Sequence, residues 1–173
     1  MEWTSYQAAL LAEPRCPLCQ GLGFCPGLPP LLCDCVYRAV FHACFVKFRQ
    51  CAKADPYRRL VTFERNLRGV DRRLTWARRN EDYCADFRAA GQRALPNHLY
   101  RVFRFYHLLG AAGELVMRRL AISRRSLTVW ITEVEVNLGR ELAHMRPYSL
   151  FPPHEYMRSG MGTSAAENAS SVA

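Results

Sequence analysis

Four cysteines in two close pairs are the residues of this chain best suited to chemistry. Two residues separate Cys16 from Cys19 and one separates Cys33 from Cys35, with a loop rich in glycine and proline between the pairs. Two pairs of thiolates on such a short segment can enclose one tetrahedral zinc ion. Four sulfur ligands leave no position for water, so we expect a structural zinc ion on these cysteines rather than a catalytic one.

The residues around the two cysteine pairs favour the same interpretation. Gly21 and Gly23 allow the backbone to turn back, so that its N–H groups can point at the sulfurs. The second pair lies where a helix is expected to begin, and a helix N-terminus stabilises thiolates. Cys25 is a competing ligand, which either replaces Cys35 or remains free. We therefore expect residues 1–35 to form an N-terminal helix and a zinc-binding module.

The charge of the chain is strongly positive and comes almost entirely from arginine. The net charge is +9, and only Lys47 and Lys53 are lysines among the 24 basic residues. Residues 36–79 carry twelve basic and three acidic side chains, an excess equal to the whole net charge. Arginine binds phosphate bidentately and stacks on bases, which indicates a nucleic-acid partner. Arginine-rich codon usage in a GC-rich genome is the alternative explanation.

The sequence lacks the features of a membrane protein, an exported protein or an enzyme. No apolar run approaches the roughly 20 residues that a membrane helix needs, and no export signal begins the chain. We therefore expect a cytoplasmic protein whose eight cysteines are metal ligands or buried thiols, not disulfides. Because no glycine-rich phosphate loop, HExxH motif or nucleophile with a neighbouring base is visible, no enzymatic activity is expected.

Beyond the cysteine pairs the chain is predicted to be mainly α-helical. Apolar residues recur at helical spacing over five segments, 36–53, 81–95, 98–109, 111–120 and 123–143. Asn80 is expected to cap the second of these helices, and residues 57–79 form either short strands or a connecting helix. We predict a mainly α fold with a small four-cysteine zinc module, a helical domain over residues 36–156 and a disordered tail over 157–173.

Residues 111–143 form a candidate helix-turn-helix. A short helix, a three-residue connection ending in the N-cap Ser123 and a longer helix have the layout of a motif whose second helix enters the major groove. Glu133 and Glu135 oppose a longer phosphate-binding face, and an ordinary helical hairpin is the alternative. The residues expected to contact DNA lie at the turn or on the outer face of the second helix: Arg118, Arg119, Arg124, Arg125, Thr128 and Thr132.

These motifs resemble parts of known families. The stretch CPLCQGLG at residues 16–23 resembles one CxxCxGxG repeat of the zinc domain of J-domain chaperones. The same half-repeat is combined with a helix-turn-helix in some phage late-gene antitermination regulators, whose layout is similar. LAISRRS at residues 120–126 resembles the turn of sigma-factor region four. Over most of its length the chain is similar to an uncharacterised, phage-associated bacterial family, through CDCVYRAVF, EDYCADF and PYSLFPPHEY.

Together these observations predict a zinc-stabilised, DNA-binding transcription regulator of phage-related origin, with double-stranded DNA as its partner. The alternative is an adaptor whose zinc module binds RNA polymerase or another protein without direct base readout. Salt distinguishes the two, because binding to phosphates weakens steeply as the salt concentration rises. The DNA target, the sign of regulation and the oligomeric state do not follow from the sequence.

Overall fold

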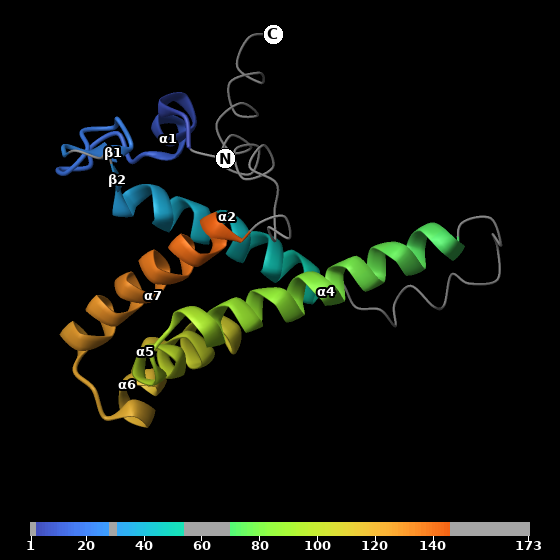
Figure 1. Cartoon of the computed structure of the whole chain (residues 1–173). Helices are drawn as coiled ribbons and strands as arrows, with labels where there is room; N and C mark the ends of the chain where they lie inside the picture. Colours follow the sequence, from blue (N-terminus) through green and yellow to red (C-terminus); the bar gives the residue numbers. More distant parts are fainter. Residues whose placement is uncertain (1–2, 28–30, 54–69, 146–173) are drawn as a thin grey trace, which may run out of the picture.

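The computed structural model of the chain describes residues 3–27, 31–53 and 70–145. It is mainly α-helical with a cysteine cluster near the N-terminus, which confirms the predicted fold class (Figure 1). None of the described helices is both long and apolar enough to cross a bilayer. The predicted tail over 157–173, the PYSLFPPHEY segment and much of the basic stretch 36–79 lie outside the described residues.

A short helix and a small hairpin form the N-terminal module. Thr4 begins α1 (Ser5–Leu11) with a capping box, in which its hydroxyl accepts a hydrogen bond from the backbone N–H of Gln7. The strands β1 (Phe24–Cys25) and β2 (Leu31–Leu32) pair in an antiparallel register. Gly23 has a φ of +80° and packs directly on the backbone of Ala8, where a Cβ atom would collide. This close contact holds α1 against the hairpin.

The helices α2 (Asp34–Lys53) and α7 (Arg124–His144) pack against each other (Figure 1). Gly139 of α7 lies so close to α2 that a Cβ atom would overlap the carbonyl group of Tyr37. Because α2 starts at Asp34, the boundary predicted between residues 35 and 36 falls inside this helix. The largest core cluster unites α2, α4, α5 and α7, and includes Phe41, Phe48, Phe87, Phe103, Leu138 and Leu142.

The helix α4 (Val70–Ala94) is continuous, which corrects the prediction of a helix that begins after an Asn80 cap. Asn80 lies inside the helix, and residues 70–79 are helical rather than strands. No proline interrupts this segment, and its many arginine and alanine residues favour helix. A glycine occurs inside the helix at position 91 because the ring of Phe103 packs directly on its backbone and leaves no room for a Cβ atom. The apolar periodicity expected over 81–95 is confirmed, since Tyr83, Cys84, Phe87 and Ala90 are buried.

Two short helices lead from α4 toward α7. The predicted helix over 98–109 is present as α5 (Asn97–Val102), followed by a π-helical segment η2 (Phe103–Leu108) that sequence periodicity did not indicate. Gly110 ends it with a φ of +65°, and α6 (Gly113–Leu120) follows. Helices α5, α6 and α7 share a separate small core made by Val102, Val116 and Leu127.

Candidate metal centre and nucleic-acid interface

The four predicted cysteine ligands bring their sulfur atoms together. All four Sγ atoms of Cys16, Cys19, Cys33 and Cys35 lie within 4.8 Å of one another. Cys16 Sγ lies 3.6 Å from Cys33 Sγ, and Cys19 Sγ lies 3.5 Å from Cys35 Sγ. A tetrahedral ion with metal–sulfur bonds of about 2.3 Å separates its sulfurs by about 3.8 Å, whereas a disulfide bond is only about 2.05 Å long. The geometry therefore fits a metal centre.

Local backbone turns position these sulfurs. After the first pair, Gln20 donates its N–H to the Cys16 carbonyl at 2.9 Å, and the backbone then turns through Gly21, whose φ is +84°. The hairpin delivers Cys33, whose N–H donates to the Gly23 carbonyl at 2.9 Å. Cys35 follows in the first turn of α2. The turns and the hairpin thus bring the two cysteine pairs together. The glycines allow these turns because they adopt positive φ without steric cost.

Hydrogen bonds and burial shift the pKa values of these thiols in opposite directions. Backbone N–H groups of Cys19 and Leu18 lower the pKa of Cys16 to about 7. Burial raises the pKa of Cys33, and it raises the pKa of Cys35 to about 11 despite the backbone N–H groups beside it. Buried thiolates therefore need a compensating positive charge. A divalent cation supplies that charge and displaces the thiol protons as it binds.

The remaining cysteines are arranged differently. Cys25 lies in β1 and pairs through its backbone with Leu31, and it does not belong to the four-sulfur cluster. Cys44, Cys51 and Cys84 are buried in the main core, which agrees with the expectation of buried thiols beside the metal ligands. Burial also raises the pKa of Cys51 and Cys84, so these thiols are poor nucleophiles at neutral pH.

The predicted DNA-contacting arginines flank one turn. The three-residue connection between α6 and α7 begins with Ala121 in the left-handed conformation, at φ 53° and ψ 46°. It ends with Ser123, whose hydroxyl accepts a hydrogen bond from the Ser126 N–H at 3.1 Å, as predicted for an N-cap. Two arginines end α6, two begin α7, and all four are exposed: Arg118, Arg119, Arg124 and Arg125.

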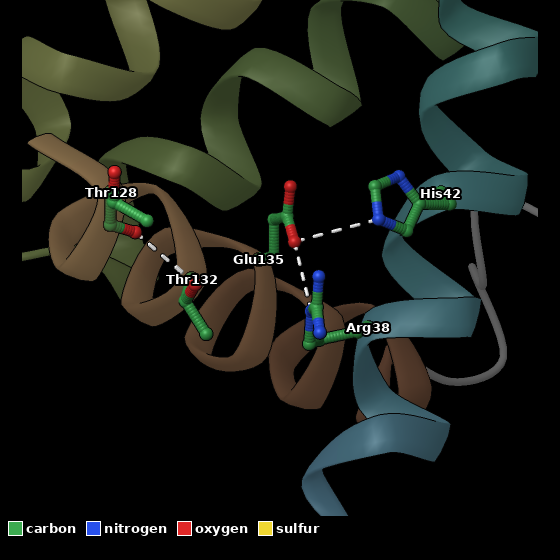
Figure 2. A network of polar contacts seen from close by, with 5 residues as sticks. All are labelled: Arg38, His42, Thr128, Thr132 and Glu135. Carbon is green, nitrogen blue, oxygen red and sulfur yellow. Dashed lines mark hydrogen bonds and ion pairs between the residues drawn. The ribbon is translucent and has the colours of Figure 1, made fainter. Parts of the chain in front are cut away.

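The two predicted threonines are exposed on α7, but their hydroxyls point back to the helix. Thr128 donates to the carbonyl of Arg124 at 3.1 Å, and Thr132 donates to the carbonyl of Thr128 at 3.2 Å (Figure 2). Each threonine has one hydroxyl proton, so neither can donate a second hydrogen bond in this arrangement. Both threonines thus face outward as predicted, with their hydroxyl protons bonded within the helix and their methyl groups available to a partner.

An ion pair around a buried carboxylate links α2 to α7 one turn beyond these threonines. Glu135 Oε2 accepts a hydrogen bond from Arg38 Nε at 3.0 Å and lies 3.5 Å from His42 Nε2 (Figure 2). Burial raises the pKa of Glu135, but His42 and Arg38 outweigh this effect and hold it below the usual range. Glu135 thus faces α2 and does not oppose a DNA-binding face, unlike the exposed Glu133.

Sequence reasoning missed the inward positions of Glu135 and His107. His107 lies in η2 with its ring centroid 5.0 Å from that of Phe41, and burial lowers its pKa to about 4. Both residues continue an apolar stripe at helical spacing, Glu135 four positions after Ile131 and His107 four after Phe103. That spacing could have indicated that both side chains point inward, but it does not reveal whether a polar residue on such a stripe has an ion-pair partner.

No family model, curated protein or solved structure matches this chain. The resemblances seen in its motifs therefore stay predictions. Function has to be inferred from the four-sulfur cluster and from the exposed surface around the α6–α7 turn. Figure 1 shows these two regions apart from each other, with the module near the start of α2 and the turn at the opposite end of α7 from His144.

Proposed function

We propose that this protein is a zinc-stabilised DNA-binding transcription regulator. The observation that carries the proposal is the group of four exposed arginines on either side of the α6–α7 turn. In the described part of the chain, none of the four forms an ion pair with an acidic side chain. Four positive charges within eight residues repel one another, and the phosphates of a duplex would compensate all of them.

The helices around the turn support a duplex as the partner. A short helix, a left-handed turn residue and a capped second helix make up the layout in which the second helix enters the major groove. The core of Val102, Val116 and Leu127 fixes α5, α6 and α7 relative to one another. Arg124 and Arg125 oppose the dipole of α7, a cost of a few tenths of a kcal/mol each, which an anion at this end would remove.

We assign the metal of the cysteine cluster as zinc with a structural role. Four thiolates in tetrahedral geometry are typical of zinc and leave no open position for a substrate. The ion would hold the hairpin on the first turn of α2. That turn contacts the distant end of α7 through Arg140 Nη2, which lies 3.6 Å from Asp34 Oδ1. The zinc module would therefore support the helix pair without contacting DNA itself.

The test measures the affinity of the purified chain for a random-sequence duplex between about 50 and 200 mM salt. The double substitution Arg124→Ala and Arg125→Ala removes two charges from the start of α7. We expect at least about tenfold weaker binding, and a salt slope that is less negative by about 1.8 for two lost phosphate contacts. Fluorescence anisotropy with a labelled duplex reports both quantities.

The matched control removes the same charge elsewhere. Lys53→Ala and Arg88→Ala together change exposed residues on α2 and α4, outside the α6–α7 turn. We expect this control to change affinity less than threefold and to keep the salt slope. Equal affinities and slopes for the wild-type chain and the Arg124/Arg125 variant would show that α7 does not contact DNA.

An adaptor function is a second candidate because the metal module exposes apolar side chains. Leu18, Leu22 and Leu31 lie beside the sulfur cluster with exposed fractions of 59%, 68% and 68%. Exposed leucines on a small rigid module favour a protein partner. The adaptor proposal predicts that Leu22→Ser with Leu31→Ser weakens binding to purified RNA polymerase. Loss of duplex binding in this variant, at unchanged metal content, would instead count against the adaptor.

A further inference from the structure

An apolar strip follows the exposed arginines on the outer face of α7. Val129 is 47% exposed although it is a large hydrophobic residue. It lies four positions after Arg125 and three before Thr132, so the three side chains share one helix face. The hydroxyls of Thr128 and Thr132 are bonded to backbone carbonyls, the second of them in Figure 2, so these threonines offer methyl groups to a partner.

Building on the proposed function, we propose that this strip reads the C5-methyl groups of thymine in the major groove. In that groove thymine is the base that presents a methyl group, and apolar side chains recognise it there. The exposed face runs from Arg124 to Glu133, about 15 Å of helix, which is comparable to the width of the groove of about 12 Å. A·T-containing duplex sites are therefore the ligand class.

Charge distinguishes this ligand from an apolar protein surface. Arg124 and Arg125 are exposed at one end of the strip, and Arg118 and Arg119 lie across the turn. Covering the strip with an apolar partner would bury these charges without compensation, whereas phosphates on both sides of a major groove neutralise them. RNA fits less well, because it lacks the thymine methyl group and its deep, narrow major groove does not admit side chains.

The decisive experiment compares two duplexes that differ only in methyl groups. One is a 30-base-pair alternating A·T duplex (a length of about three helical turns), and the other carries deoxyuridine in place of every thymidine. We expect the full chain to bind the thymine duplex at least about fourfold more tightly, which is the value of one buried methyl group. The ratio of the two affinities, measured at one salt concentration, cancels the contribution of the phosphates.

Two variants test whether the preference for the thymine duplex over the uracil duplex comes from these side chains. The triple substitution Thr128→Ser, Val129→Ala and Thr132→Ser removes methyl groups and keeps both hydroxyls, so the ratio should fall to about one while the salt slope stays unchanged. The double substitution Thr128→Val with Thr132→Val keeps the methyl groups and removes the hydroxyls, so the ratio should persist. All three residues are exposed on a helix, and unchanged thermal melting checks the fold of each variant.

The outcomes separate this inference from the proposed function. Salt-dependent duplex binding that is lost with Arg124→Ala and Arg125→Ala, but with equal affinity for the thymine and uracil duplexes, overturns methyl reading alone. A ratio that survives the triple substitution, or disappears in the double-valine variant, also overturns it. Absence of salt-dependent binding to any duplex overturns the proposed function and this inference together.

Discussion

His107 is enclosed by aromatic side chains in the main core. Its ring centroid lies 5.0 Å from that of Phe41 and 5.3 Å from that of Phe45, both in edge-on geometry. Within the described residues its buried Nε2 atom has no hydrogen-bond partner. A charged imidazolium is costly in such a site, so burial lowers the pKa to about 4.

This pKa shift predicts a pH-dependent stability. In the unfolded chain His107 takes up a proton below its ordinary pKa of 6.5, whereas in the folded chain it stays neutral until about pH 4. Acidification from pH 6.5 to about pH 5 therefore favours unfolding and should lower the free energy of unfolding by about 1.6 kcal/mol through this group. Urea denaturation across this pH range measures the loss.

The control for this prediction is His107→Met, which fills the aromatic site without a titrating group. The difference in unfolding free energy between the two proteins should grow as the pH falls. Protonation of the cysteine thiolates also changes the unfolding free energy with pH, but this contribution is the same in the wild-type chain and in the variant, so it cancels in the difference. Parallel pH profiles for the wild-type chain and the variant would contradict the assignment to His107.

Ala121 occupies a backbone conformation that normally favours glycine. Its φ of 53° and ψ of 46° place it in the left-handed region at the end of α6. Ala121→Gly should therefore raise the free energy of unfolding by about 0.5–1 kcal/mol, since the relief of strain exceeds the added entropy of the unfolded chain. The exposed Ala85 of α4 offers the control, because Ala85→Gly inside a helix should lower stability by about 1 kcal/mol. Effects of the same sign would exclude backbone strain at Ala121.

At the scale of elements, the pairing of α2 with α7 depends on one glycine. A Cβ atom at Gly139 would overlap the carbonyl of Tyr37, so the two helices cannot stay at their present separation with any larger residue. The same approach allows the ion pair between Arg38 and Glu135 and the stacking of Arg140 on the Tyr37 ring. Close helix packing thus brings polar contacts from α2 to the helix that carries the proposed DNA-binding face.

Gly139→Ala tests this packing. Although alanine favours helix over glycine, the steric conflict with α2 should lower the free energy of unfolding by about 2–3 kcal/mol. Gly113→Ala is the matched control, because within the described part of the chain a Cβ there meets only Leu127 Cδ2, at 3.5 Å, and should be neutral or stabilising. Denaturant unfolding followed by circular dichroism measures both. A stabilising effect of Gly139→Ala would show that the helices separate easily.

At the scale of the whole molecule, the N-terminal module and the helical body contain two distinct buried clusters, and Trp3, Leu11 and Leu32 pack against both. The cluster in the module consists largely of its own ligands, namely Cys16, Cys19 and Cys33 together with Ala12 and Val36. The main core contains none of these sulfurs and unites α2 with α4, α5 and α7. We therefore expect the module to depend on a bound metal for its stability, whereas the body has a larger hydrophobic core of its own.

Metal removal should accordingly loosen one part of the chain. After treatment with a chelator, we expect amide hydrogen exchange to accelerate over residues 16–33 while α7 keeps its protection. The purified protein should contain one equivalent of zinc, and Cys33→Ser should lose it. Cys25→Ser is the control and should retain it, because Cys25 lies outside the four-sulfur cluster. Retained metal in Cys33→Ser, or global unfolding on chelation, would contradict this division.

Features encoded over short distances along the chain were predictable. The four cysteines fall within twenty residues, and their spacing was enough to group them before any fold was known. The turn with its Ser123 cap follows from local hydrogen bonding, and the buried side of α4 follows from helical periodicity. In each case the interacting groups are close in sequence, so they meet whatever the tertiary arrangement of the rest of the chain.

The remaining features depend on partners from distant segments. Glu135 reads along the chain as an acidic residue beside a basic surface, yet it is buried because Arg38, 97 positions earlier, reaches it across the α2–α7 contact. His107 is neutral because aromatic rings from α2 surround it. Whether an ionisable side chain is exposed, ion-paired or neutral depends on the residues that pack against it. The sequence of one segment does not show which residues of a distant segment those are.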